Sequence, residues 1–566
     1  MATAEKLLRR VLAREPSHFG AHELMGYVLG NRGDAEGAFK HLRKATQSAS
    51  ASAESWYYLA RSFRDRGRHG EAVDAIGKAM SLRGEFPEAL HDLGVALFEL
   101  GKPREALAAL DRARALAPGV FEIHYNRGRA LDALQRYGDA LASYAEALRL
   151  APAHVGSWTN CGAVLHDLGR FEEALVHYDR ALELSPTDEK ALVNRAVTLR
   201  ALDRLPDALE AYDRALALYP RNAEAWTFRG AVLDELGRPA EALQHYARAL
   251  AIDPAFAEAR WNEALTRLTL GEFEAGWEGF ESRWLCRRPA GRRHTGTAPW
   301  LGKQPLQGKR ILAWAEQGYG DTIQFCRYVP LLAERGADVV LEAPAALAGL
   351  LASLPACTVA VNAAADGGFD YQVPLLSLPL AFGTHLASVP NAVPYLSISP
   401  GRAREWADRI RKAEDRPRIG IACSGSEAHL HDRKRSMALR EFDVLRPHAS
   451  LYVIQKGLRE ADQGYLREAV EGIRYLGDEI RDFGDTAAII ANLDLVVSVD
   501  TAVAHLAGAL GKDVWILLPQ AAEWRWLVGR SDSPWYPTAR LFRQERRGDW
   551  AGVMSRVREA LQSLAA

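Results

Sequence analysis

Small residues return at a fixed spacing through the first half of the chain. One small residue falls 34 positions after the last at Gly26, Ala60, Gly94, Gly128, Gly162, Ala196, Gly230 and Ala264. An aromatic residue keeps the same spacing at Tyr144, Tyr178, Tyr212 and Tyr246. Because small residues let two helices approach closely, this pattern predicts a stack of helix pairs.

This period and its small and aromatic positions resemble the tetratricopeptide repeat family from about Glu15 to Trp284. The resemblance implies about eight repeats in an all-α solenoid over residues 1–284, with a concave groove that binds protein partners. The last repeat departs from the pattern in "GEFEAGWEGFESRW", where Gly276 and Arg283 replace alanines. We expect this aromatic-rich segment to cap the solenoid and to dock it on the region that follows.

Asparagine stands two positions before the small residue in four repeats. In tetratricopeptide geometry this position lies on the helix that lines the groove, and asparagine can both donate to and accept from a peptide backbone. The series resembles the asparagine ladder of the O-GlcNAc transferases, which implies an acceptor-protein site. The alternative is that these asparagines bond neighbouring helices. The residues are Asn126, Asn160, Asn194 and Asn262.

Short apolar runs alternate with helical segments after a basic stretch rich in Gly and Pro. "RILAWAE" and "ADVVLEA" flank a predicted helix from Asp321 to Arg335, and "RIGIACSGS", "SLYVIQKG", "IRYLGD", "LDLVVSVD" and "DVWILLP" follow as predicted strands. Such alternation is typical of parallel α/β sheets. We expect a linker at 285–308, two Rossmann-like halves at 309–397 and 398–547, and a final helix at 548–566.

Several motifs in this region resemble a known enzyme family. "AEQGYGDTIQFCRYVP", "HDRKRSMALREF", "VIQKGLRE", "DTAVAHLAGALGK" and "EWRWLVGRSDSPWYPTARLFRQ" are similar to the catalytic half of bacterial tetratricopeptide and glycosyltransferase fusions related to the heptosyltransferases. The resemblance spans about Pro299 to Trp550. It implies a GT-B glycosyltransferase with a cleft between its halves, an acceptor side at 309–397, a nucleotide-sugar side at 398–547 and a final helix that packs across the first half.

The segment "SVDTAVAHLAGALG" predicts a strand that turns into a helix at Asp500. Thr501 and His505 then share one helix face near the N-terminus, where free N–H groups and the helix dipole attract anions. The resemblance implies that Asp500, Thr501 and His505 form a donor-binding site, with Thr501 and His505 on the diphosphate and Asp500 ordering the turn. The alternative is that Asp500 caps the helix and His505 is a packed histidine.

Two further segments end predicted strands. Lys434 and Arg435 in "HDRKRS" stand where the related enzymes place a basic residue on phosphate, and could stabilise negative charge on a departing nucleotide. Gln455 and Lys456 in "QKG" could contact the nucleotide or the sugar. The alternative for the basic pair is a solvated loop.

Asp321 is the predicted catalytic base. It follows the glycine-containing loop "QGYG", in the position where the resemblance implies a carboxylate that deprotonates the acceptor hydroxyl. The alternative is that Asp321 is a helix N-cap. Glu316 and Gln317 are nearby alternates.

Composition narrows the class of protein. A formal net charge of −1 gives no support for a nucleic-acid partner, and five scattered cysteines form no CxxC pair. The N-terminus lacks the apolar run of a signal peptide, and we see no predicted transmembrane segment. We therefore expect a cytoplasmic protein. No metal-binding DxD motif stands at an expected position, so we expect metal independence and no cofactor besides the nucleotide-sugar substrate.

Together these features predict a protein O-glycosyltransferase that transfers a sugar from a nucleotide-sugar to Ser or Thr of a protein held by the repeats. Flagellin is one candidate acceptor, since some fusions of this build modify it. Two alternatives stay open: a tetratricopeptide scaffold with a non-catalytic GT-B region, and a heptosyltransferase-like enzyme acting on lipid or polysaccharide. The donor sugar, the nucleotide base and the stereochemical outcome are not specified by the residues.

Overall fold

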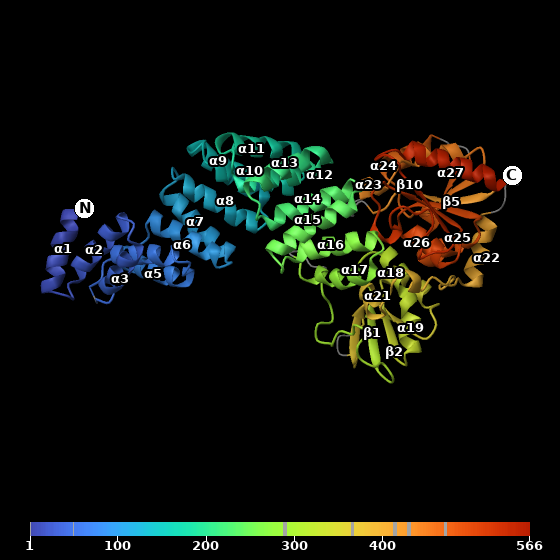
Figure 1. The fold of residues 1–566 in the computed structure, drawn as a ribbon, viewed down its shortest axis with the longest axis horizontal. Helices are drawn as coiled ribbons and strands as arrows, with labels where there is room; N and C mark the ends of the chain where they lie inside the picture. The colour runs from blue at the N-terminus through green and yellow to red at the C-terminus, as the bar shows by residue number, and fades with distance from the viewer. Residues whose placement is uncertain are drawn as a thin grey trace. The chain divides into compact units, whose positions relative to one another are not determined.

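The computed structural model describes residues 2–48, 50–286, 291–363, 367–410, 416–426, 432–468 and 472–565. The chain divides into two compact units, Met1–Pro220 and Arg221–Ala566 (Figure 1). The second unit therefore includes the last repeat helices as well as all the strands. Among the described residues, no helix combines the length and the apolar character needed to cross a bilayer.

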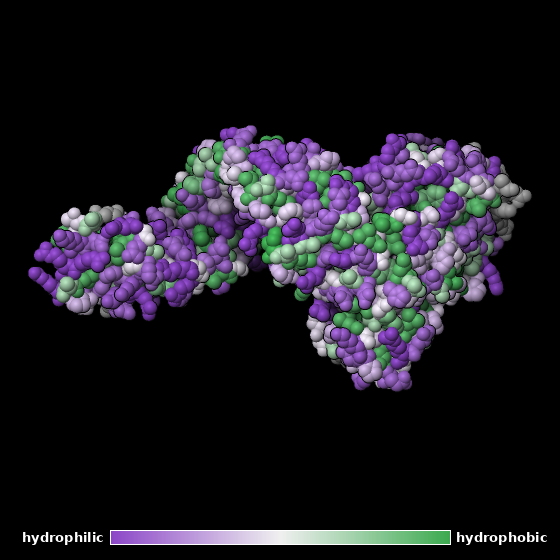
Figure 2. All heavy atoms as spheres, in the orientation of Figure 1, coloured by the Kyte–Doolittle hydropathy of each residue, from purple (hydrophilic) through white to green (hydrophobic). Residues whose placement is uncertain are grey.

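The described part of the first unit is entirely helical. After α1, consecutive helices pack as pairs, α2 with α3 and so on to α12 with α13. Hydrophilic residues predominate on the face of this unit seen in Figure 2. The helices are α1 (Ala2–Arg14), α2 (Phe19–Asn31), α3 (Ala35–Ala45), α4 (Ala53–Arg64), α5 (His69–Arg83), α6 (Pro87–Glu99), α7 (Pro103–Leu116), α8 (Phe121–Ala133), α9 (Tyr137–Leu150), α10 (Val155–Asp167), α11 (Phe171–Leu184), α12 (Glu189–Ala201) and α13 (Leu205–Leu218).

The repeated small and aromatic residues form the contact inside each pair. A Cβ on Gly128 of α8 would lie 2.5 Å from the ring of Tyr144 on α9, and a Cβ on Gly162 would lie 2.6 Å from the ring of Tyr178. Both rings are fully buried. The predicted all-α repeat solenoid is thus confirmed. These positions hold small residues because a larger side chain would overlap the tyrosine ring of the paired helix.

The second unit begins with two more helix pairs and a short 3₁₀ helix. Trp277 of α17 donates its indole N–H to the carbonyl of Thr384 at 3.0 Å and packs edge-on against Trp524, while Phe273 stacks against Trp535. One apolar core joins these aromatic side chains to both sheets. The elements are α14 (Ala223–Glu235), α15 (Pro239–Ile252), α16 (Ala257–Thr269), α17 (Phe273–Phe280) and η1 (Glu281–Trp284).

The first sheet has four parallel strands in the order β3-β2-β1-β4. The predicted helix from Asp321 to Arg335 is in fact three shorter segments. Pro330, at the second position of the last segment, is well placed to begin a new helix and not to continue an old one. The elements are β1 (Arg310–Trp314), α18 (Tyr319–Phe325), η2 (Cys326–Tyr328), α19 (Val329–Glu334), β2 (Asp338–Glu342), α20 (Ala345–Leu351), β3 (Thr358–Ala360), β4 (Tyr371–Pro374), η3 (Leu375–Ser377), α21 (Leu378–Ala381) and η4 (Leu386–Ser388).

The second sheet has six parallel strands in the order β10-β9-β8-β5-β6-β7. Five of them coincide with the predicted apolar runs, whereas β10 was not predicted. The elements are α22 (Pro400–Arg409), β5 (Arg418–Ala422), α23 (Asp432–Arg435), η5 (Leu439–Leu445), β6 (Ser450–Val453), α24 (Glu460–Arg467), β7 (Ile473–Tyr475), η6 (Gly477–Glu479), α25 (Phe483–Ala491), β8 (Leu495–Val499), α26 (Ala502–Ala509), β9 (Val514–Leu518), η7 (Trp524–Trp526), β10 (Ala539–Arg543) and α27 (Trp550–Ala565).

The final helix corrects one expectation. Val553, Met554 and Val557 of α27 are buried in the same core as residues of β5, β6 and η5, which belong to the second half. The prediction that this helix packs across the first half is therefore wrong. Its apolar face covers its own sheet instead.

Both sheets have a point where the strand order reverses. In the second sheet β5 is followed by β6 and β7 on one side and by β8 on the other, so the reversal lies between β5 and β8. In the first sheet it lies between β1 and β4. Open parallel sheets bind ligands beyond the carboxyl ends of the strands at such points. The predicted α/β character of this region is confirmed, and the two reversal points are where a ligand is expected to bind.

Candidate functional site

The candidate site starts at the carboxyl end of β8. Thr501 is the N-cap of α26, with extended backbone angles, and its hydroxyl lies 3.1 Å from the Ser498 hydroxyl. The alternative in which Asp500 caps the helix is therefore wrong, because the cap falls one residue later. The first N–H groups of an α-helix have no partner within the helix, so the N-terminus of α26 is suited to an anion.

His505 lies inside the protein, one turn into α26. Its Nδ1 atom is 2.9 Å from the Tyr536 hydroxyl, its Nε2 atom is 3.8 Å from an Asp500 oxygen, and its ring stacks on Trp526. Burial, followed by the charge of Arg525, holds the pKa of His505 well below its usual value. The imidazole is neutral at neutral pH, so it can offer a hydrogen bond but no charge.

Asp500 is almost completely buried beside this histidine. Burial and then the nearby Glu523 carboxylate raise the pKa of Asp500 to about 6, while Trp526 and Arg525 oppose the shift. A carboxyl group with this pKa is partly protonated near pH 6. It therefore repels an anionic ligand less than an ordinary aspartate does.

Asp321 approaches the same place from the first half. The helix α18 begins at Tyr319 with Gly318 as its N-cap, so the alternative in which Asp321 is the N-cap is wrong. Asp321 stands at the third position, where its Oδ2 atom accepts a 2.8 Å hydrogen bond from the Gly318 N–H. Its other oxygen accepts from the Arg525 guanidinium, which comes from the loop after β9.

Arg525 is the centre of this arrangement. It is buried, donates to Asp321, Glu523 and the side-chain oxygen of Gln324, and stacks over the ring of Trp524. Its carboxylate neighbours raise its pKa against the opposing effect of burial, so it stays charged. One cation thus connects the predicted base with the α26 end of the site.

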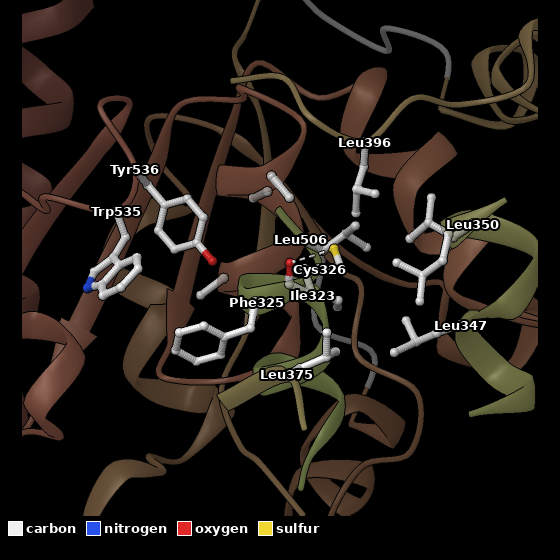
Figure 3. Close-up of a cluster of buried hydrophobic side chains, with 14 of the residues drawn as sticks. Ile323, Phe325, Cys326, Leu347, Leu350, Leu375, Leu396, Leu506, Trp535 and Tyr536 are labelled. Carbon is white, nitrogen blue, oxygen red and sulfur yellow. Dashed lines mark hydrogen bonds between the residues drawn. The ribbon is translucent and has the colours of Figure 1, made fainter. Parts of the chain in front are cut away.

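A second buried arginine fastens the two halves. Arg327 of η2 donates to the carbonyls of Trp535 and Pro390, at 2.6 and 3.0 Å, and to the Tyr395 hydroxyl at 2.9 Å. Figure 3 shows the apolar packing around this connection, in which α18 and η2 meet α26 and the Trp535 loop. The side chains labelled there include Ile323, Phe325, Cys326, Leu506, Trp535 and Tyr536.

Only one member of the predicted basic pair reaches this site. Arg435 is close enough to shift the pKa values of both Asp500 and His505, and a Cβ on Gly425 would lie 2.7 Å from its guanidinium. Lys434 instead forms an ion pair with Glu235 of α14. The structure thus separates two neighbours that the sequence treats as equivalent. His431 of the same motif lies outside the described residues.

The predicted donor contacts at the end of β6 have other partners. Gln455 accepts from the N–H groups of Cys423 and Ser424 and donates to the Ser424 hydroxyl and the Gly457 carbonyl. The oxygen and the nitrogen of the Gln455 amide therefore both hold the loop after β5. Lys456 is exposed, with its ammonium 3.3 Å from the Arg481 carbonyl.

Glu316, the alternate base, belongs to a different contact. Arg283 of η1 donates to both of its oxygens at 3.0 Å, and the Leu376 N–H donates to it at 3.2 Å. Burial is the largest influence on its pKa and raises it. Because both side chains are buried, Glu316 serves the attachment of the last repeat and is not available as a base.

The predicted groove asparagines are all partly buried. Asn126 donates to the Glu122 carbonyl at 3.0 Å and lies 2.9 Å from a His91 ring nitrogen on the preceding groove helix. Asn160 donates to the Tyr125 hydroxyl at 3.4 Å. These two side chains bond neighbouring helices, as the alternative predicted. Asn194 lies in α12 of the same unit, whereas Asn262 lies in α16 of the second unit.

Three residues of this site were not predicted from the sequence: Arg525, Glu523 and Tyr536. A signal was present: "EWRWLVGRSDSPWYP" alternates charged and aromatic residues directly after a predicted strand. In the described part of the chain, no cluster of three or more His, Cys, Asp or Glu side chains is arranged to hold a metal ion. Metal independence stays a prediction.

Comparison with known proteins identifies the repeats. Tetratricopeptide repeat profiles match residues 24–81, 91–155 and 193–255, and another profile of the same description matches 155–220. The chain therefore contains tetratricopeptide repeats, a type of module that binds other proteins.

One curated protein is similar to about half of the chain. Protein FlbA of Caulobacter vibrioides is 28% identical over 324 residues, which make up 53% of this chain and 54% of that protein. The chain thus spans about half the length of the curated relative that it matches.

Two solved structures are similar to part of the chain. YrrB, a tetratricopeptide protein with an unusual peptide-binding site, is 23% identical, covers 33% of this chain and 95% of its own, and has a TM-score of 0.30. PilF of Pseudomonas aeruginosa is 21% identical, covers 38% of this chain and 97% of its own, and has a TM-score of 0.34.

Proposed function

We propose that this protein is a protein O-glycosyltransferase of GT-B architecture. Its two α/β halves would bind a nucleotide-sugar, and its tetratricopeptide repeats would recruit the acceptor polypeptide. The observation that carries the proposal is the meeting of Asp321 from the first half with Arg525, Asp500 and His505 of the second, at the carboxyl ends of two parallel sheets. A base opposite an anion-binding helix end is what sugar transfer from a nucleotide diphosphate requires.

In the proposed reaction the acceptor hydroxyl oxygen attacks the anomeric carbon of the sugar. The bond between that carbon and the diphosphate oxygen breaks, and the hydroxyl proton passes to the Asp321 carboxylate. Arg435, the N–H groups at the start of α26 and neutral His505 stabilise the negative charge that collects on the leaving diphosphate. Arg525 must then turn part of its hydrogen bonding from Asp321 toward the ligand.

The test is intact-protein mass spectrometry of flagellin from cells carrying the wild-type gene, Asp321→Asn or His505→Ala. We expect flagellin to lose sugar mass in both variants while each variant protein stays folded and abundant. Asp478→Asn, an exposed aspartate of η6, is the matched control and should leave the mass unchanged. If flagellin from both site variants has the same mass as flagellin from the wild type, this site does not glycosylate flagellin.

A non-catalytic scaffold is the second candidate function. It is favoured by the internal partners of Lys434 and Gln455, two residues that a donor site was predicted to use. Binding of UDP, ADP or GDP to the purified full-length protein distinguishes the two candidates. A transferase should bind at least one of them and lose affinity on substitution of Arg435 by Gln, whereas a scaffold without a nucleotide site should bind none.

A further inference from the structure

The first unit contains a hollow of about 560 Å³ among the helices that carry the predicted groove asparagines. It is bordered by α6, α8, α9, α10 and α12. The residues that matter for its chemistry are Phe98, Tyr125, Asp132, Tyr144, Asn160 and Asp167.

Two carboxylates in the hollow have no cationic partner among the described residues. Asp132 is partly buried, and no ion pair or side-chain hydrogen bond compensates it or Asp167 in that part of the chain. Burial, followed by the negative charge of Asp167, raises the pKa of Asp132 to about 6. Carboxylates left in this state at neutral pH attract a cation.

The hollow also contains a buried hydroxyl, that of Tyr144. Tyr144 is fully buried, and among the residues that the structure describes its hydroxyl finds no hydrogen-bond partner of acceptable geometry, although it lies beside Asn160 and Asp132. A buried hydroxyl usually has a partner, so one left without a partner next to an open hollow points to a ligand atom. A peptide carbonyl or amide would supply it.

The cations near the hollow do not neutralise the acidic pair. Arg129 donates to Glu99 at 3.0 Å and to Asn126 at 3.3 Å, and its guanidinium lies 4.4 Å from the centre of the Phe98 ring. The positive charge of Arg129 is therefore already balanced by Glu99. Lys190 is exposed at the border of the hollow.

We propose that this hollow binds an arginine or lysine side chain of an extended polypeptide, with the cation between Asp132 and Asp167. The Tyr144 hydroxyl bonds the main chain beside it, and the ring of Tyr125 contacts the aliphatic stem. The proposal rests on the proposed role of the repeats in recruiting an acceptor and names the chemistry of that acceptor. It is independent of sugar transfer.

The test is fluorescence polarisation with the full-length protein, at low salt and pH 7.5, without any sugar donor. The probes are a fluorescein-labelled Ser/Gly peptide with one central Arg and the same peptide with Gln. We expect the Arg peptide to bind about tenfold more tightly, the gain typical of a charge-assisted hydrogen bond. The preference should disappear in the double variant Asp132→Asn, Asp167→Asn.

Two single variants complete the experiment. Tyr144→Phe should weaken both peptides while leaving the preference for Arg, because it removes only a main-chain contact. Asp74→Asn, an exposed aspartate of α5 outside the hollow, is the matched control and should change neither affinity. Equal affinity of the two peptides for the wild type, no binding of the Arg peptide, or a preference that survives the double substitution would each overturn the proposal. None of these outcomes depends on whether the protein transfers sugar.

Discussion

Gly320 and His505 pack so closely that a Cβ on residue 320 would lie 2.8 Å from the Cδ2 atom of the imidazole. Gly320 belongs to α18 of the first half and His505 to α26 of the second. The His505 ring cannot give way easily, because it stacks on Trp526 and bonds Tyr536 on its other side. The absence of a side chain at residue 320 therefore sets the distance between the two helices that carry the candidate site.

Substitution of this glycine should disturb the site. We expect Gly320→Ala to lower the free energy of unfolding by about 1–3 kcal/mol, the usual cost of overpacking, and to weaken nucleotide binding. Thermal melts and nucleotide titrations of the purified protein measure the two effects. Gly349→Ala in α20 is the matched control, since a Cβ there meets nothing within 4 Å. That control should be neutral or slightly stabilising; a similar loss in both variants would contradict the packing explanation.

Removal of Arg283 should detach the last repeat from the first sheet. Arg283→Met leaves the buried Glu316 carboxylate without its ion pair, and such a loss typically costs about 3–5 kcal/mol. The double variant Arg283→Met, Glu316→Gln should recover part of the loss, because only the partly exposed Glu281 carboxylate is then left without Arg283. Denaturant unfolding followed by tryptophan fluorescence checks this, and the Trp277 indole lies at the contact. Equal stability of the single and double variants would show that the charge is not the cause.

The pKa of Asp500 makes nucleotide binding depend on pH. The pKa of Asp500 is about 6, so at lower pH the carboxyl is mostly protonated and neutral. At higher pH its negative charge opposes the binding of a diphosphate. When the pH falls from 7.5 to 5.5, the affinity of the wild type for a nucleoside diphosphate should increase. We expect that factor of increase to be about three times as large as the factor for Asp500→Asn. Calorimetric titrations of both proteins at the two pH values measure this, and the titration of the ligand itself cancels in the comparison. Parallel pH profiles would exclude Asp500 as the titrating group.

The ionised Asp132 carboxylate should lower the free energy of unfolding at neutral pH. Its folded-state pKa of about 6 exceeds the ordinary value of 3.8, so its contribution favours folding less as the pH rises from about 4 to about 6. Because the carboxylate is only partly buried and water screens it, Asp132→Asn should stabilise the protein at pH 7.5 by about 1 kcal/mol. The difference in melting temperature should shrink at pH 4.5. A destabilised variant at pH 7.5 would mean that the carboxylate has a favourable partner.

Sequence periodicity was sufficient for the repeats because each Gly or Ala and its aromatic partner lie in adjacent helices. Asp321, Asp500, Thr501 and His505 were predicted from the resemblance of their motifs to an enzyme family, and the structure places them beyond the carboxyl ends of β1 and β8. The sequence could not separate Arg435 from Lys434, because neighbouring residues in a loop can point in different directions. It missed Arg525, whose role depends on a contact with a residue 204 positions away. Strand β10 was not predicted because the exposed Arg540 interrupts its apolar pattern.

The anchoring of the last repeats limits where this chain could be recombined with another. A junction at residue 284 would replace Arg283, Trp277 and Phe280, and a foreign repeat would leave the Glu316 carboxylate and the Trp524 ring without these native partners. A junction at Pro220 would exchange the six helix pairs from α2 to α13 and keep the native aromatic contacts of α17. The hollow around Asp132 lies entirely within the exchangeable part. Chimeras joined at Pro220 could therefore acquire new partners while inheriting an unchanged α/β region.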